Sequence, residues 1–281
     1  MKIKQNASQW KLLEMLHIGD DPTDTDSGAP LQWMKFAGTQ PEAQGPIVIL
    51  AGFNGPARNE SRILQLLQRA LANDVITTVS DLYLCPIVNP TSQSKAPHLN
   101  CKGNDIFNDF PTKKNKSASD IGQSFEVTQL LRWINKVQPK AVLSLQADKC
   151  LINHFGCSDD ILEKLTTLSE RHVLGLGESP KLSEEEERDL AKMPEDEVIA
   201  HNYEKNVGEW CNENDVVWIN FSVDGAKKDF EELREDWRLN TGPALKWLLE
   251  GPRFNPPVEE PFFITPIVVQ SVDLPPELMN L

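Results

Sequence analysis

The segment Pro46-Ile47-Val48-Ile49-Leu50-Ala51-Gly52 decides the fold of this chain of 281 residues. It is a short apolar run that does not alternate with polar residues and ends at a glycine, as is typical of a strand buried on both faces. Such strands belong to parallel sheets that helices cover on both sides. We therefore expect a parallel sheet at the centre of the molecule.

Other segments of the chain continue this pattern. Further strands are expected at 31–36, 141–145 and 216–221, and 81–90 is expected to be a strand that runs into a loop. Helices are expected at 10–16, 61–72, 124–137 and 230–249. Alternating strands and helices form right-handed crossovers, which place helices on both faces of the sheet. The sequence thus predicts a three-layer α/β/α fold with a mostly parallel, mixed central sheet. A site is expected in the loops beyond the carboxyl ends of the strands.

Composition excludes several classes of partner. The formal net charge of -14 disfavours binding to a phosphate backbone, so no nucleic acid is expected. No apolar run approaches the roughly 20 residues that span a bilayer, so no membrane insertion is expected. The first six residues lack the apolar core of a secretory signal, and the five cysteines show no paired framework. We therefore expect a cytoplasmic protein with reduced thiols.

One domain is expected over 1–281, with three additions to its core. These are an N-terminal extension at 1–26, an acidic insertion at 178–200 and a C-terminal extension at 251–281. The insertion is predicted to be a solvated helical segment rather than a surface for cations or a basic partner. The C-terminal extension carries an apolar segment at 262–270. This segment is either an added edge strand or a contact through which 261–281 forms a homodimer.

The stretch Asn100-Cys101-Lys102-Gly103-Asn104-Asp105-Ile106-Phe107-Asn108-Asp109-Phe110-Pro111 resembles a known signature. It is similar to Asn-x-x-Gly-x-Asp-Leu-Asn-Arg-x-Phe-Pro of the zinc carboxypeptidase (carboxypeptidase A-like) superfamily. Phe107 and Asn108 stand where that family has an Asn-Arg pair that holds a substrate carboxylate. The resemblance extends in order from about residue 27 to 250. It is closest to the murein tripeptide amidase branch, whose Gly-Ser-Trp-Cys resembles 208–211 here.

The resemblance also implies where the family's catalytic residues would lie. Its zinc ligands, His, Glu and His, correspond to Asn54, Ala57 and Gln146, and its general base, a Glu, corresponds to Ser222. Amide side chains offer zinc only weak neutral oxygens, and alanine offers nothing. A serine cannot replace a carboxylate as a base. Glu60 is close to these positions in sequence but out of register with them.

A rival metal site is possible at Cys150, His154 and Cys157, which we expect in one loop. Residues of these types bind zinc when a fourth ligand or a water completes the site. The alternative is a loop with buried thiols and an exposed imidazole. Serine catalysis has no support because the sequence lacks a Gly-x-Ser-x-Gly motif.

These observations predict an inactive metallocarboxypeptidase-like protein, a pseudoenzyme without a cofactor. It would bind a small peptide-like or polar ligand, or a protein partner, in its vestigial cleft. The residues expected to line that cleft are Asn54, Ala57, Phe107, Asn108, Gln146 and Ser222. Two alternatives stay open. One is an active zinc carboxypeptidase or amidase-type hydrolase that acts on small murein-like peptides through an atypical metal site. The other is a structural role through the C-terminal segment.

Overall fold

The computed structural model describes residues 31, 33–41, 45–55, 59–93, 95–96, 98–112, 124–148, 151–169, 172–175, 205–224, 229–251 and 254. Within this part of the chain, seven strands form one sheet in the order β1-β3-β2-β4-β7-β5-β6. The strands are β1 (Met34–Phe36), β2 (Ile47–Leu50), β3 (Leu82–Cys85), β4 (Ala141–Asp148), β5 (Leu151–Phe155), β6 (His172–Gly175) and β7 (Val217–Asp224).

The sheet is mixed and mostly parallel, which confirms the prediction. Strands β3, β2, β4 and β7 are parallel neighbours and form its centre. Strand β1 pairs antiparallel with β3, and β5 pairs antiparallel with β7. Strand β6 is parallel to β5. All four residues of β2 are buried, as expected for a strand covered on both faces.

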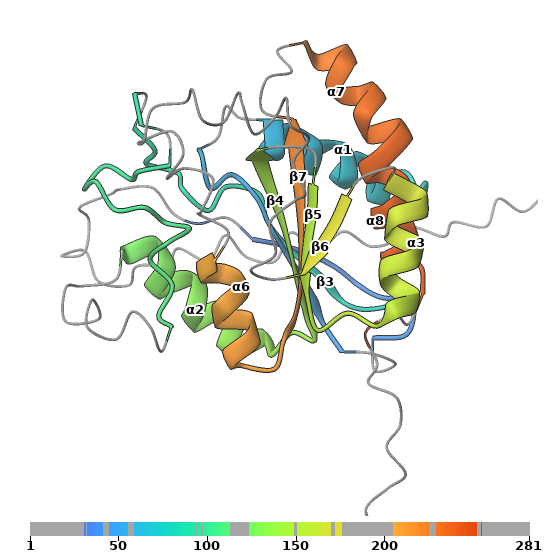
Figure 1. Ribbon diagram of the computed structural model, residues 1–281, viewed down its shortest axis with the longest axis horizontal. Helices are drawn as coiled ribbons and strands as arrows, with labels where there is room; N and C mark the ends of the chain where they lie inside the picture. The colour runs from blue at the N-terminus through green and yellow to red at the C-terminus, as the bar shows by residue number, and fades with distance from the viewer. Residues whose placement is uncertain are drawn as a thin grey trace, which may run out of the picture.

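Helices cover both faces of the sheet (Figure 1). On one face lie α1 (Asn59–Ala72), α3 (Asp159–Ser169), α7 (Phe230–Asp236) and α8 (Gly242–Leu249), which share an aliphatic core with the sheet. On the other face lie α2 (Phe125–Val137) and α6 (Lys205–Glu213), whose core is richer in aromatic residues. The three-layer α/β/α architecture is therefore confirmed.

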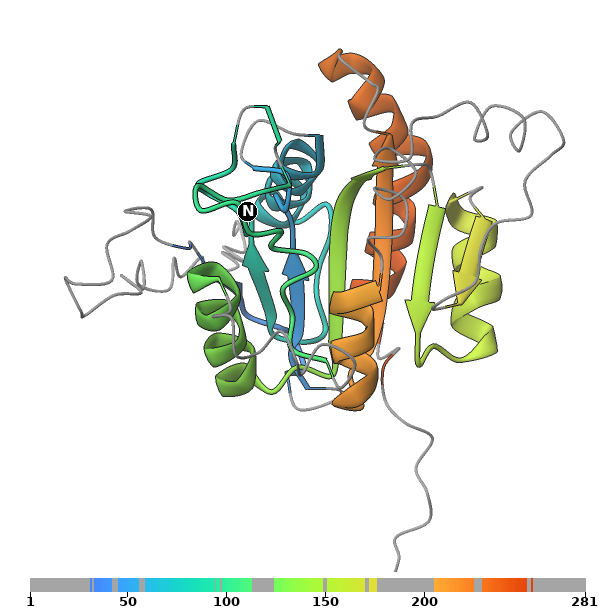
Figure 2. The ribbon, with the colours of Figure 1, turned by 60° about the vertical axis from the view of Figure 1, so that its left-hand side comes forward.

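The single helix expected over 230–249 is interrupted. A π-helical turn, η2 (Trp237–Thr241), separates α7 from α8. A Cβ atom on Gly242 would lie 2.6 Å from the carbonyl oxygen of Trp237, so only glycine fits at the end of this turn. Both ribbon views show α7 projecting past the carboxyl ends of β4 and β7 (Figures 1 and 2).

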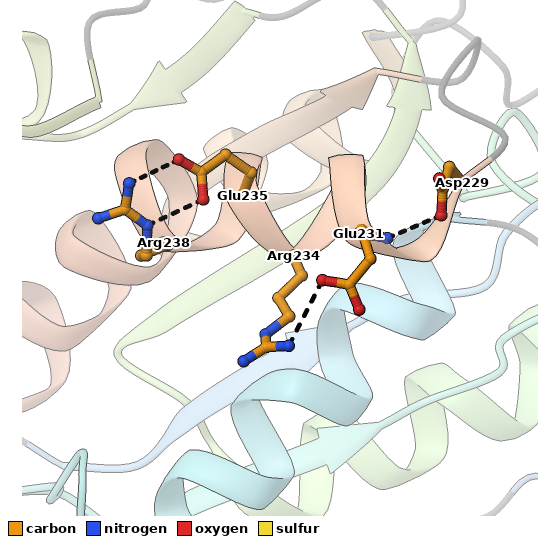
Figure 3. Close-up of polar contacts among 5 residues, drawn as sticks. All are labelled: Asp229, Glu231, Arg234, Glu235 and Arg238. Carbon is orange, nitrogen blue, oxygen red and sulfur yellow. Dashed lines mark hydrogen bonds and ion pairs between the residues drawn. The ribbon is translucent and has the colours of Figure 1, made fainter.

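Two ion pairs lie along α7 and the turn η2 that follows it (Figure 3). The Asp229 side chain accepts a hydrogen bond from the Glu231 backbone at 3.0 Å and caps the helix. Arg234 pairs with Glu231, and Arg238 pairs with Glu235. All four of these paired side chains are exposed, so the pairs add little to stability. Both arginines are thus engaged with carboxylates three residues earlier in the chain.

Several elements were not anticipated from the sequence, namely β5, α3, β6 and α6. The expected helix at 10–16 and the extension at 1–26 lie outside the described residues. The same is true of the insertion at 178–200 and of 251–281 apart from Gly251 and Phe254. Among the described helices, none combines the length and apolar character needed to cross a membrane. The described cysteines, Cys85, Cys101, Cys157 and Cys211, form no disulfide.

Candidate functional site

The loop that carries the signature stretch is built around a buried carboxylate, Glu126 of α2. One Glu126 oxygen accepts a hydrogen bond from Thr91 Oγ1 at 2.9 Å, and the other accepts from Asn100 Nδ2 at 3.0 Å. The Asn100 Oδ1 atom in turn accepts from the backbone N–H groups of Lys102 and Asn104. Asn100 therefore closes its own turn and ties it to α2.

Asp105 organises the next part of the same loop. Its Oδ1 atom accepts from the backbone N–H groups of Phe107 at 3.1 Å and Asn108 at 3.3 Å. Its Oδ2 atom accepts from Asn108 Nδ2 at 2.9 Å. The amide of Asn108 is thus turned back onto its own loop. It supplies no positive charge where the resemblance places an arginine.

The end of this loop is attached to the start of α2. The backbone N–H of Ser124 donates to the Asp109 carboxylate. The Ser124 hydroxyl oxygen then caps α2 by accepting from Val127 N at 3.3 Å. Burial raises the pKa of Asp109 above its ordinary value, and the hydrogen bonds from Ser124 act in the opposite direction.

The exit of β2 is joined to this loop by aromatic side chains. The rings of Phe53 and Phe107 meet edge to face, with centroids 5.3 Å apart. The next residue, Asn54, donates its backbone N–H to Glu60 Oε1 at 3.2 Å. Glu60 lies fully buried in the first turn of α1 and anchors the loop. Ala57 lies outside the described residues.

A chain of buried polar side chains connects β4 and β7. Gln146 and Ser222 are directly opposite each other in the parallel register. Asn220 Nδ2 donates to Gln146 Oε1 at 3.2 Å and to Ser222 Oγ at 3.4 Å. Ser144 Oγ donates to Asn220 Oδ1 at 2.8 Å, and Trp218 Nε1 donates to Ser144 Oγ at 3.2 Å. We call these five residues the polar ladder.

The polar ladder lies on the face of the sheet that α2 and α6 cover. Side chains alternate between the faces of a strand, so Ser144 and Gln146 share a face with the core residue Val142. On β5, Asn153 stands directly opposite Asn220 in the antiparallel register and leaves the sheet on that face too. Sequence reasoning missed Asn153 and three ladder residues, Ser144, Trp218 and Asn220. A signal was present, because polar residues recur at every second position of two otherwise apolar strands.

The structure brings the expected cleft residues together in two groups. Gln146 and Ser222 meet in the polar ladder through Asn220. The loops of Asn54, Phe107 and Asn108 form the second group through the Phe53–Phe107 contact. Because β2, β4 and β7 are adjacent parallel strands, both groups lie at the carboxyl edge of one sheet.

The described residues that the resemblance places at zinc-ligand positions do not fit zinc. Asn54 and Gln146 are neutral amides, and the oxygen of Gln146 already accepts a hydrogen bond. Across the part of the chain that the structure describes, no group of three or more His, Cys, Asp or Glu residues could hold a metal ion.

The rival site needs a correction, because its three residues do not share a loop. His154 belongs to β5, a strand that the sequence analysis missed. Burial raises the pKa of Cys157 to about 12, which opposes formation of the thiolate that binds zinc. Cys150 lies outside the described residues.

Comparison with known proteins defines the fold. No protein-family model and no curated protein matches the sequence. Solved structures match it at low sequence identity, and this similarity shows the fold alone. Murein-tripeptide amidase MpaA from Escherichia coli O157 has a TM-score of 0.54 and 18% identity, over 82% of this chain and 89% of that one. A metallo-carboxypeptidase from Burkholderia cenocepacia has a TM-score of 0.49 and 13% identity, over 78% of this chain and 61% of its own. A succinylglutamatedesuccinylase/aspartoacylase from Rhodobacter sphaeroides has a TM-score of 0.48 and 14% identity, over 82% of this chain and 63% of that one.

Proposed function

We propose that this protein is a non-catalytic member of the zinc carboxypeptidase-like fold that binds a small polar, peptide-like ligand at the carboxyl edge of its sheet. One observation carries the proposal. Gln146 and Ser222 stand where the resemblance places a zinc ligand and the general base, and both accept a hydrogen bond from Asn220. The two positions thus belong to one buried network of neutral groups.

The chemistry of that network supports binding rather than hydrolysis. Ser222 is fully buried, and its hydroxyl cannot take a proton from water as a carboxylate can. The network also gives a reason for the family's zinc ligands and general base to be replaced together by neutral residues. A carboxylate or imidazolium left here without a metal would be a buried, uncompensated charge, which is strongly destabilising. Neutral amides and hydroxyls that bond to one another avoid this cost.

The surroundings favour a neutral ligand. The buried polar residues of the described part include the carboxylates Glu60 and Glu126 but no lysine, arginine or histidine. The amide of Asn108 is bonded to Asp105. Among the described residues, a free carboxylate would therefore find buried negative charge and no buried bidentate cationic partner.

A second candidate is an active hydrolase with an atypical metal site, and Glu60 is the observation that favours it. This carboxylate is buried beside Asn54, at the strand exit where the resemblance places two zinc ligands. A single carboxylate with two amides is a poor zinc site, which is why we rank this candidate second.

A hydrolysis assay separates the two candidates. The purified protein is incubated with murein tripeptide and with blocked di- and tripeptides, with added zinc and with a chelator. The Escherichia coli amidase serves as the positive control. We expect no zinc-dependent turnover. Turnover that requires zinc and disappears in Glu60→Gln would establish the hydrolase and overturn the non-catalytic role.

A further inference from the structure

We propose that residues 262–270 of this chain dock as an added strand on the outer edge of β1, within the same molecule and antiparallel to β1. This docking surface is separate from the proposed ligand site and does not depend on it. The segment itself lies outside the described residues. Its position follows from the free edges of the sheet, from the place where α8 ends and from the sequence of the tail.

Two strands of the described sheet have a free edge. β1 and β6 stand at the two ends of the strand order, and their described partners are β3 and β5 respectively. Along an antiparallel edge strand, backbone N–H and C=O groups alternate between facing the partner and facing away from it. An added strand can therefore form a backbone ladder at β1 or at β6, and at no other described strand.

The last described helix, α8, ends close to β1. Val79 connects the two, because its N–H donates to Leu249 O at 2.9 Å and its carbonyl oxygen accepts from Gln40 N at 2.8 Å. Thr77 N also donates to Glu250 Oε1 at 3.2 Å. The end of α8 thus lies at the amino end of β3. From β3, the outer edge of β1 is two strand spacings away, about 10 Å, whereas that of β6 is six spacings away, about 29 Å.

The linker between the described chain and the segment is long enough to reach β1. Residues 255–261 include Pro256, Pro257 and Pro261, and proline-rich linkers are extended at about 3.1 Å per residue. This linker therefore spans about 22 Å, roughly twice the lateral distance to the outer edge of β1. Because β1 and β3 are antiparallel, the amino end of β3 is the carboxyl end of β1. A segment that starts there and follows β1 runs antiparallel to it.

The sequence of 262–270 suits an outermost strand at this edge. It reads Phe-Phe-Ile-Thr-Pro-Ile-Val-Val-Gln and contains no charged residue. Met34 of β1 is only partly buried against the aliphatic core, so apolar side chains on a neighbouring strand would complete its cover. Pro266 has no N–H, which is tolerated in an edge strand and hinders the pairing of any further strand.

The tether favours the chain's own segment over that of a second molecule. A short linker holds the segment near β1 at an effective concentration of about millimolar. The same segment of another molecule, present at micromolar concentration, competes poorly with it. Docking within one molecule also closes an edge that would otherwise be open to other chains.

Hydrogen–deuterium exchange on the full chain tests the docking through peptides that cover β1 and β6. Ile267→Asp combined with Val268→Asp places one charge on each face of the segment. Val272→Asp combined with Leu274→Asp is the matched control, because it places two charges in the same tail outside the segment. The first variant should raise exchange of the β1 peptide by at least about fivefold, as expected for the loss of one backbone hydrogen bond per amide. The control should leave β1 at the wild-type rate, and β6 should not change in either variant.

The wild-type protein gives a second measurement that does not depend on a variant. Residue-resolved exchange should find the amides of Met34, Lys35 and Phe36 all protected, at a level that does not change with protein concentration. Alternating protection along β1 would show a free edge and overturn the proposal. Protection that grows with concentration, together with dimers in sedimentation, would assign the edge to a second copy and overturn it too. So would a response of the β6 peptide in place of β1, or no response of either peptide to the charges at 267 and 268.

Discussion

Replacing Asn220 with alanine is expected to destabilise the protein far more than the same replacement of Asn153. The two residues form a matched pair. Both are buried asparagines that stand opposite each other on neighbouring strands, so both replacements remove the same volume from one face of the sheet. They differ in hydrogen bonding, because Asn220 is the centre of the polar ladder whereas Asn153 Oδ1 has no hydrogen-bond partner.

The bonds of Asn220 give the size of the difference. Its side chain accepts one hydrogen bond at 2.8 Å and donates two at 3.2 and 3.4 Å. At about 1 kcal/mol net for each bond, Asn220→Ala should cost about 3 kcal/mol more than Asn153→Ala. With a urea dependence of about 3 kcal/mol per molar, its unfolding midpoint should lie about 1 M lower than that of Asn153→Ala.

Urea unfolding followed by tryptophan fluorescence and circular dichroism measures both variants under one set of conditions. Coincident transitions by the two probes establish that the free energies can be compared. Equal destabilisation by the two replacements would refute the reasoning, because it would mean that the polar ladder contributes no hydrogen-bond energy beyond the packing of its side chains.

Three further predictions concern the loops and thiols around the site. Burial raises the pKa of Cys85 to about 12 whereas Cys101 is exposed, so at pH 8 Cys101→Ser should lower the thiol count seen by Ellman's reagent and Cys85→Ser should not. Because the pKa of Asp109 is raised, its carboxylate costs stability at neutral pH and the cost is relieved as pH falls through the raised pKa. The free energy of unfolding of Asp109→Asn relative to wild type, measured in urea, should therefore be most favourable at pH 7 and should fall towards pH 4. Gly52 and Gly103 both have positive φ, but a Cβ on Gly52 would lie 2.8 Å from backbone atoms while one on Gly103 meets nothing within 4 Å. Gly103→Ala should thus cost about 1 kcal/mol and Gly52→Ala clearly more, and equal melting temperatures would contradict this.

The centre of the fold was predictable because its strands are apolar throughout. The runs around Ile49 and Leu143 can only be buried, and the segments between them show helical spacing. The edge of the sheet was harder to predict from the sequence. Strand β5 contains Asn153 and His154, so it lacks the apolar signature, and it was mistaken for a loop. The π-helical turn was missed because it depends on the contact of Gly242 with Trp237, which spacing alone does not reveal.

The site was predictable only in part. Order along the chain placed Gln146 and Ser222 at strand exits, and the register pairs them. Their connection through Asn220 depends on hydrogen bonds across strands that are distant in sequence, and a motif does not encode these. Glu60 was judged out of register, yet it anchors Asn54 because the first turn of α1 folds back to the exit of β2.

Zinc binding tests the central claim most directly. The claim is that the position of the family's metal site is now a neutral hydrogen-bonded network. Equilibrium dialysis against zinc, followed by metal analysis, is carried out on the wild-type protein and on Gln146→Ala. The account predicts equal zinc content in the two proteins, because Gln146 contributes nothing to metal binding. One zinc per chain in the wild type that is lost in Gln146→Ala would contradict it.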